Sequence, residues 1–429
     1  SLVSLGLLRM MLTKSSKVGY FRPIINEVKD SEFDDHTNTA IKFFNLDIDY
    51  NDCFAYKQSE VVELLSEGKS DDVIHNVIKK YKKLEAKYDY VLVEGTDFSG
   101  EGGFTELDVN LMIAKNLNVP ALIVGSGHGK KKKDFINTMQ LTYKSFINKE
   151  VDVIGIVANK IEVDEVDYIQ KELHKSFPEK LQIDIIPKVD FLAFPTVKEV
   201  VQALNGRVLF GEQFLDNAIG SYSTGAMQLR NYLTRIKENA LVVTPGDRAD
   251  IILGALQANA SSNYPKIAGI ILTGTLTPEE SIIKLIEGVQ STVPIILVDG
   301  GTFKITNIIG SVKSKIYATH EKKILLSLDT FDKYVNAEGL TNKLNSHQSD
   351  KLTPSMFQYN LLQKARIKKK HIVLPEGDDE RIIKAAARLQ LLDIVDLTLL
   401  GDKNAIQLKC DQIGLQIDLD KINILNPTD

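Results

Sequence analysis

Short runs of apolar residues alternate with amphipathic stretches along most of the chain. Runs such as ALIVGS (121–126), ALVVTP (240–245) and IAGIILTG (267–274) are apolar almost throughout, as strands covered on both faces are. Amphipathic segments such as 71–88 and 281–291 lie between such runs. This rhythm predicts an α/β fold with parallel sheets and right-handed crossovers. The further strand candidates are 18–25, 90–95, 153–160, 183–187, 294–300, 371–375 and 397–401.

The 429 residues are too many for a single hydrophobic core, so we expect a multi-domain α/β protein built of three-layer, parallel-sheet domains. The strand–helix rhythm breaks in the glycine-rich and polar segment 205–233. It breaks again in 337–370, which has no good strand and ends in a basic cluster. These breaks predict a first domain over 1–205, a second over 206–330, a helical connector over 331–370 and a last segment over 371–429.

The charge balance gives no sign of a nucleic-acid partner. The net charge is -5, whereas such a partner favours a basic domain. Cys53 and Cys410 lie far apart in no metal or redox spacing, which fits a reduced, cytoplasmic setting. No apolar run approaches the roughly 20 residues of a membrane span. The apolar start, 1–12, has neither the basic region nor the cleavage site of a signal peptide. Because it also lacks an initiator Met, we expect the chain to be clipped at its front.

The first predicted domain has some of the residues of a nucleotide-binding site. A phosphate loop needs a strand, glycines and then a helix. Residues 1–12 could be that helix, with Ser1 in the place of the final Ser or Thr of the loop, but no strand and glycines precede it. Glu94 ends a strand and suits Mg²⁺ held through water, while Asn159 and Lys160 end another and could read a base edge. The alternative is that these strand ends are polar because they meet solvent.

Two glycine-rich segments give weaker signals. GSGHGKKKKD (125–134) follows a strand but has Val124 where a phosphate loop has its first glycine, and Lys131 where it has Ser or Thr. A solvated basic helix start is the better interpretation. GEGGF (100–104) could close over a ligand, but a surface loop explains it equally well.

Two turns share one design, a strand followed by an acidic turn, an arginine and a helix. In TPGDRAD (244–250), Asp247 can cap the helix and Asp250 suits its dipole, which leaves Arg248 for an anion or a surface ion pair. In LPEGDDER (374–381), the acids 378–380 suit the same two roles. Capping does not explain Glu376, Gly377 or Arg381. The chain has no HExxH, GxSxG, CxxC or GxGxxG motif, so motifs alone identify no metal site and no complete catalytic set.

KKHIVLPEGDDERIIKAAARL (369–389) closely resembles the opening of the transacetylase domain of phosphate acetyltransferases, and 352–366 resembles the connector before it. TPGDRADIILGAL (244–256) is similar to the start of the DRTGG domain of the long-form enzymes, with Asp247 and Arg248 kept but Ala249, Asp250 and Ile251 in place of Thr-Gly-Gly. GYFRPI, YVLVEG and GIVANK are similar to the dethiobiotin-synthetase-like front domain of that form. Arg22 stands where active relatives of the front domain have a phosphate-contacting Lys.

This resemblance implies reversible acetyl transfer between acetyl-CoA and phosphate, with both as substrates and no tightly bound cofactor. It also implies a front domain that lacks its first strand and phosphate loop, and a transacetylase domain that only begins at 371. The implied catalytic groups, a carboxylate base with Ser and Arg groups that bind phosphate, would lie beyond Asp429. We therefore expect residues 1–429 alone to be inactive and the chain to be cut at both ends.

The implied site residues are the loop Glu376, Gly377, Asp378 and Arg381, the turn Asp247 and Arg248, and a nucleotide set, Ser1, Glu94, Asn159 and Lys160, that would be a remnant. We expect small-molecule substrates, a homo-oligomer, and no nucleic-acid or membrane partner. Two alternatives stay open. The front domain could be an ATP-dependent ligase-like enzyme, or 1–330 could be a regulatory and assembly module.

Overall fold

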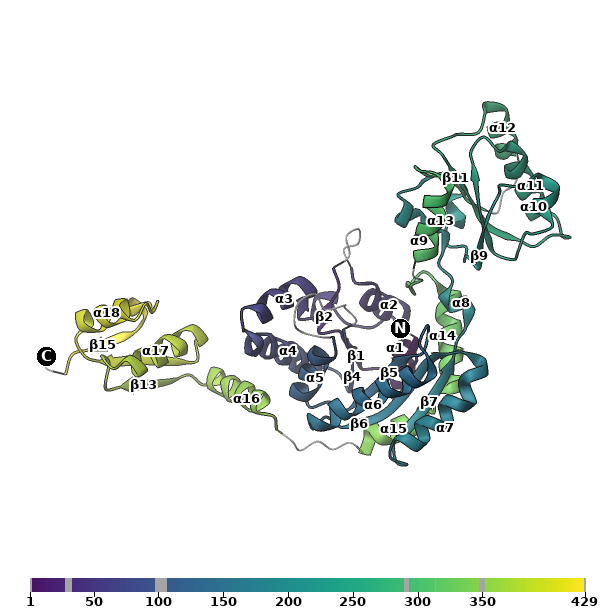
Figure 1. The fold of residues 1–429 in the computed structure, drawn as a ribbon. Helices are drawn as coiled ribbons and strands as arrows, with labels where there is room; N and C mark the ends of the chain where they lie inside the picture. The colour runs from purple at the N-terminus through teal and green to yellow at the C-terminus, as the bar shows by residue number, and fades with distance from the viewer. Residues whose placement is uncertain are drawn as a thin grey trace.

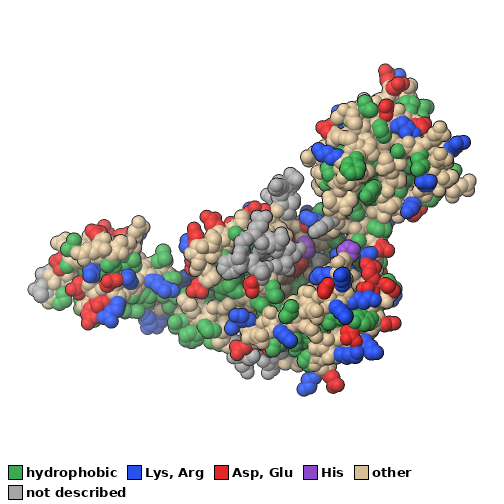
Figure 2. Space-filling model, viewed as in Figure 1, with side chains coloured by type: hydrophobic (Ala, Val, Ile, Leu, Met, Phe, Trp, Pro, Cys, Tyr) green, Lys and Arg blue, Asp and Glu red, His purple; other side chains and the backbone are tan. Residues whose placement is uncertain are grey.

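The computed structural model describes residues 2–27, 33–96, 106–288, 293–312, 314–346 and 352–427. They form a central front unit, a second unit attached to it by a narrow neck, and a small carboxyl-terminal unit (Figure 1). Most strand pairs are parallel, and helices connect the strands. The predicted α/β class is therefore confirmed. On the face shown in Figure 2, acidic and basic side chains are interspersed over all three bodies.

The front unit runs from the amino-terminal helix α1 (Leu2–Leu12) to the short helix α8 (Asp190–Ala193). Its other elements are β1 (Val18–Phe21), β2 (Ile24–Ile25), α2 (Asp35–Phe44), β3 (Tyr56–Lys57), α3 (Gln58–Ser66), α4 (Ser70–Glu85), β4 (Tyr90–Val93), α5 (Glu106–Leu117), β5 (Ala121–Ser126), α6 (Lys132–Asn148), β6 (Val153–Ile161), α7 (Val166–Ser176) and β7 (Gln182–Pro187).

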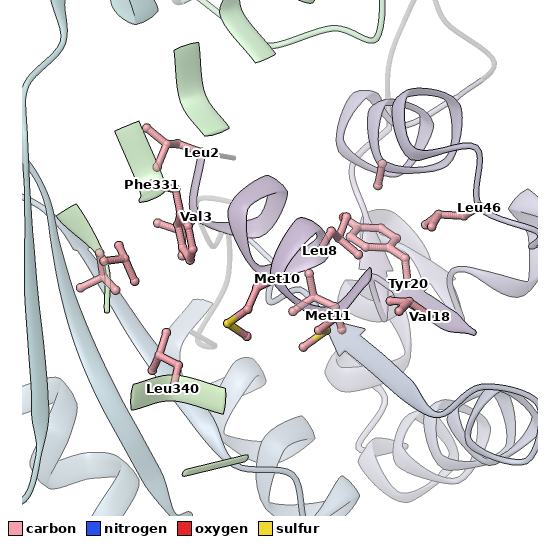
Figure 3. Packing of buried hydrophobic residues seen from close by; sticks show 14 of the residues in the cluster. Leu2, Val3, Leu8, Met10, Met11, Val18, Tyr20, Leu46, Phe331 and Leu340 are labelled. Carbon is pink, nitrogen blue, oxygen red and sulfur yellow. The ribbon is translucent and has the colours of Figure 1, made fainter. Parts of the chain in front are cut away.

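The main sheet of the front unit is in two parts. β1 pairs with β4, and β5, β6 and β7 form a second parallel ladder. Among the described residues, no ladder joins β4 to β5. Both parts are covered on the same side by α1, whose apolar residues share one core with Val18 and Leu92 of one part and Val157 and Ile186 of the other (Figure 3). On the other side, α3, α4 and α5 cover β1 and β4, and α6 and α7 cover the second ladder.

The second unit is built on a five-stranded sheet in the order β8-β12-β11-β10-β9. α10, α11 and α12 cover one face, and α9 and α13 cover the other. β8 runs antiparallel to β12, which is an exception to the expected parallel pairing. The elements are α9 (Val197–Leu204), β8 (Arg207–Phe210), β9 (Ser221–Thr224), α10 (Leu229–Leu233), β10 (Ala240–Pro245), α11 (Ala249–Ala260), β11 (Ile267–Thr273), α12 (Glu280–Gly288), β12 (Ile295–Leu297) and α13 (Thr302–Ser311).

Three helices follow the second unit, and all of them pack on the front unit. α14 (Glu321–Tyr334) packs on α1, and α15 (Ala337–Ser346) packs on α1 and β6. α16 (Pro354–Ile367) packs on α4 and α5, where the hydroxyl of Ser355 donates to Asn116 at 2.7 Å. The chain therefore returns to its first unit before the last one begins.

The carboxyl-terminal unit contains a three-stranded parallel sheet in the order β13-β14-β15. α17 and α18 cover one face of it. Val373 of β13 is 54% exposed, and its register partner Thr398 points away from that core. The elements are β13 (Lys370–Leu374), α17 (Glu380–Leu392), β14 (Val395–Leu400), α18 (Lys403–Gln412) and β15 (Asn423–Leu425).

Each strand candidate named from the sequence overlaps a strand, and 121–126 and 240–245 match β5 and β10 in full. Among the described residues, four strands were not expected, namely β3, β8, β9 and β15. Both cysteines are buried and free. Within the described ranges, no helix has the length and apolar character needed to cross a bilayer. The predicted domain boundaries stay predictions.

The close contact between α1 and α14 gives a first prediction. A Cβ at Gly6 would lie 2.1 Å from the ring of Phe331, so Gly6→Ala forces this buried contact apart. We expect the free energy of unfolding to fall by about 1–3 kcal/mol, although Ala is the better helix former. Urea unfolding followed by circular dichroism measures the change.

Gly288→Ala is the matched control, because a Cβ there would meet no atom within 4 Å. It should leave the free energy of unfolding unchanged or raise it by up to about 1 kcal/mol. An equal effect of both substitutions would contradict the packing of α1 on Phe331.

Candidate functional site

A group of buried and partly buried polar side chains lies where β1 and β4 end. We call Tyr20, Arg22, Asp34, His36 and Glu94 the Arg22 cluster. β1 and β4 pair in register from Val18 with Tyr90 to Phe21 with Val93, so Arg22 and Glu94 follow neighbouring strands at the same edge. The backbone N–H of Glu94 donates to Phe21 at 2.8 Å, which extends the ladder to this point.

Glu94 accepts hydrogen bonds on both carboxylate oxygens. Tyr20 donates its hydroxyl to Oε2 at 2.8 Å. Arg22 Nη1 lies 3.3 Å from Oε1, and His36 Nδ1 lies 2.7 Å from the same atom. The Glu94 side chain is 13% exposed and that of Arg22 is 1% exposed. Glu94 is therefore surrounded by donors of this chain.

Asp34 completes the cluster from the start of α2. It caps the helix by accepting from the N–H of Thr37 at 3.0 Å, and its Oδ1 lies 3.8 Å from Arg22 Nε. Its own N–H donates to the hydroxyl of Tyr50 at 2.7 Å. One buried guanidinium therefore faces two carboxylates, as burial of charge requires.

The cluster shifts the protonation of two of its members. Burial and the charge of Glu94 hold the pKa of Tyr20 well above its ordinary value. Burial also raises the pKa of Glu94, but the positive charge of the amino terminus of residues 1–429, followed by His36 and then Arg22, lowers that pKa by more. The net pKa of Glu94 lies well below the ordinary value, so the carboxylate is ionised at neutral pH.

The structure does not join the predicted nucleotide residues into one site. Glu94 lies with Arg22, whereas Asn159 and Lys160 lie at the end of β6, in the other part of the sheet. Lys160 is exposed and has φ 57°, at a register shift between Asn159 and Ile161. No hydrogen bond or ion pair of the described residues links either of them to the Arg22 cluster. Ser1 and the glycine-rich segment 100–104 lie outside the described residues.

In the turn 244–250 of the second unit, Arg248 bonds to neighbouring residues of the same unit. Arg248 pairs with Asp250 at 2.8 Å and donates to the carbonyl of Met227 at 2.8 Å, so the interpretation as a surface ion pair agrees with its contacts. The N-cap of α11 is Arg248 with no side-chain bond. The expectation that Asp247 caps this helix was therefore wrong, because the turn places Asp247 one residue too early.

Contacts in the loop before α17 account for Gly377 and Arg381, whose presence helix capping did not explain. Asp379 is the N-cap and accepts from the N–H of Arg381 at 2.8 Å, and the guanidinium of Arg381 also bonds Asp379 at 3.1 Å. The backbone at Gly377 passes so close to β14 that a Cβ would lie 2.6 Å from the carbonyl of Leu400. Glu376 accepts from the N–H of Asp379 through its backbone carbonyl at 3.0 Å. The bonds between Asp379 and Arg381 and the close approach of Gly377 thus shape this loop.

Tyr20, Asp34 and His36 were not expected from the sequence. Tyr20 lies inside a strand candidate, and Asp34 precedes a helix with Thr37 three residues on, which is the only local signal of a cap. Tyr20 and His36 bond Glu94, and Asp34 faces Arg22, which the local sequence does not indicate. In the described part of the chain, no group of His, Cys, Asp and Glu is arranged to hold a metal ion.

Models of three domain families match the chain. The AAA domain matches residues 1–194, the DRTGG domain matches 199–312, and the phosphate acetyl/butaryl transferase family matches 356–429.

The chain is similar over its full length to curated phosphate acetyltransferases. It is 37% identical to that of Nitratidesulfovibrio vulgaris, of which it spans 61%, and 36% identical to that of Synechocystis, of which it spans 62%, with 100% of this chain covered in both cases. The resemblance to phosphate acetyltransferases is thus confirmed. The prediction that the chain is cut at both ends gains no support from these matches.

A solved structure also matches part of the chain. It contains the CBS and DRTGG domains of the regulatory region of Clostridium perfringens pyrophosphatase in complex with diadenosine tetraphosphate. The TM-score is 0.24 at 16% identity, with 36% of this chain and 71% of that chain covered.

The Arg22 cluster predicts strong coupling between its charges. Arg22→Met leaves Glu94 and Asp34 buried without their cation, so the free energy of unfolding should fall by about 3–5 kcal/mol. In Arg22→Met/Glu94→Gln the loss should be smaller than the sum of the two single losses, because one uncompensated charge is removed. Urea unfolding of the wild type and three variants measures this, and additive losses would contradict the pairing.

The lowered pKa of Glu94 predicts an acid-dependent stability. Because the folded-state pKa lies below the unfolded value of 4.5, ionised Glu94 stabilises the fold above that pH, and this is lost as the pH falls through the folded-state pKa. Glu94→Gln should therefore flatten the decline of unfolding free energy between about pH 5 and about pH 3. Glu179→Gln, at an exposed position, should keep the wild-type slope. A wild-type slope in Glu94→Gln would contradict the shift.

Proposed function

We propose that the protein functions as a phosphate acetyltransferase, which converts acetyl-CoA and phosphate into acetyl phosphate and CoA. The observation that carries this proposal is the similarity to curated phosphate acetyltransferases along the entire chain, at 37% and 36% identity. The match of 356–429 to the phosphate acetyl/butaryl transferase family supports the same reaction. Acetyl-CoA and phosphate are the proposed substrates, without a tightly bound cofactor.

In the proposed reaction, phosphate and CoA exchange one acetyl group. In the direction of acetyl-CoA synthesis, the thiolate of CoA attacks the acetyl carbonyl, the carbon–oxygen bond to phosphate breaks, and phosphate leaves. A general base must take the thiol proton, and donors must stabilise the oxyanion that forms on the carbonyl. We assign none of these roles to Glu376, Gly377, Asp378 or Arg381. The contacts of Gly377 and Arg381 support a role for these two residues in shaping the first strand–helix loop of the transferase region.

The two alternative functions are less well supported. A ligase-like ATP site would need Glu94 for Mg²⁺, but Tyr20, Arg22 and His36 already bond its carboxylate. A purely regulatory or assembly role does not account for the transferase match at 356–429.

The protein is also proposed to form a homo-oligomer, because Phe357 and Leu361 on α16 are each 56% exposed. Sedimentation of the purified protein tests it.

The proposed activity is tested by CoA release from acetyl-CoA, followed with a thiol reagent in the presence and absence of phosphate. Because the matched relatives are longer than this chain, the product of the whole open reading frame and residues 1–429 are assayed side by side. We expect phosphate-dependent release from the former and none from the latter. No release by the complete product would refute the proposal, and release by residues 1–429 would refute the expectation that they lack the catalytic groups.

A further inference from the structure

The neck between the front unit and the second unit is built around a buried lysine. The chain crosses the neck twice, outward after α8 and back before α14. Lys323 of α14 is 3% exposed, and its Nζ donates to the carbonyl of Phe194 on the outward crossing at 2.6 Å and to the hydroxyl of Ser314 on the return crossing at 2.7 Å. One ammonium group therefore ties the two crossings together. We call residues 194–199, Asp216 and 314–323 the joint.

The return crossing is also fixed to both units. The backbone N–H of Lys315 donates to Glu199 of α9 at 2.8 Å, and its Nζ pairs with Asp35 of α2 at 2.9 Å. The carbonyl of Ile316 accepts from the hydroxyl of Thr39 at 3.1 Å. Glu199 is 6% exposed and also accepts from the N–H of Thr196 at 2.7 Å. The carboxylate of Glu199 is thus committed to backbone groups, and no hydrogen bond joins it to Lys323.

His320 closes the joint on the side of the second unit. It is the N-cap of α14, where its side chain makes no capping bond. Its Nε2 lies 3.4 Å from Asp216, its ring packs edge-on against Tyr317 at 5.1 Å, and its buried Nδ1 has no hydrogen-bond partner. The His320 side chain is 5% exposed, and that of Asp216 is 58% exposed.

We propose that the joint is a pH-sensitive clamp, which holds the second unit against the front unit while His320 is neutral and loosens when His320 is protonated. A proton on His320 would place a second buried cation beside Lys323, three residues away on the same helix. It would also place that charge at the amino end of α14, where the helix dipole is positive. A proton on Nδ1 of His320 would have no hydrogen-bond acceptor among the residues that the structure describes. A buried N–H group without an acceptor is costly, and so is a buried cation next to another one.

The charged groups that face His320 agree with this direction. Burial lowers the pKa of His320 and Lys323 lowers it further, while Asp216 and Glu199 oppose the shift. Asp216 is screened by solvent and Glu199 is committed elsewhere, so the net pKa lies below the ordinary His value. The clamped state is thus fully stable above about pH 6.5 and loses stability as the pH falls below that value. The ratio of open to clamped molecules should then rise by up to about tenfold per pH unit.

The experiment measures the distance between the two units in the full chain. Spin labels on Lys171→Cys of α7 and Lys304→Cys of α13, both exposed positions, report the distance distribution by pulsed electron resonance, while Cys53 and Cys410 are buried. We expect one narrow distribution at about pH 7.5 and a broader one at about pH 5.5, across the ordinary His pKa. Circular dichroism checks that the units stay folded. An unchanged distribution in the wild type would overturn the proposal.

Variants identify the group that responds. His320→Gln should abolish the change with pH, while the control His174→Gln, at an exposed position of α7, should keep it. Asp216→Asn removes the acid that favours protonation, so the midpoint should move to lower pH. Lys323→Met should give the broad distribution at both pH values, because both crossings lose their shared donor. A pH response that survives in His320→Gln, or a midpoint that rises or stays in Asp216→Asn, would refute the clamp.

Discussion

The packing of α1 holds together parts of the chain that are distant in sequence. α1 lies over both parts of a sheet whose strands β4 and β5 share no ladder, and Gly6 lets Phe331 of α14 reach its backbone. Arg9 of the same helix pairs with Asp332 and donates to the carbonyl of Leu328 at 2.7 Å. Because α14 also carries Lys323 and has His320 as its N-cap, one helix contributes to both the front core and the neck.

The amino end of α2 connects the two sets of buried charges. Asp34 faces Arg22 in the cluster, and its neighbour Asp35 pairs with Lys315 in the joint. The Arg22 cluster and the joint therefore meet at two adjacent residues at the start of one helix. The two adjacent residues are Asp34, the N-cap of α2, and Asp35, its first residue.

The fold could be predicted from the sequence where a strand is buried on both faces. The run 240–245 matches β10, which is buried along most of its length, because such strands have continuous apolar sequences. The run 121–126 matches β5 as well, although Val124 is 46% exposed there. β8 and β9 lie at the edges of their sheet, where residues such as Tyr222 remain exposed, and their sequences carry no such run. Glu94 could be singled out as a strand-end acid. Its partners could not, because Tyr20, Arg22 and His36 come from a neighbouring strand, the residue after it and a helix that lies beside it only in the folded chain.

For the loop before α17, the family match bears on the reaction, and the contacts bear on the roles of the individual residues. The order Pro375-Glu376-Gly377 was left unexplained by capping, and the close approach of Gly377 to Leu400 now supplies a steric reason for the glycine. Asp379 and Arg381 bond each other at the start of α17, so their charges are used within the loop. A loop that is stabilised by its own residues can position a strand–helix junction without taking part in chemistry. The similarity of 356–429 to a transferase family thus supports the reaction, while the contacts of this loop support a structural role for its residues.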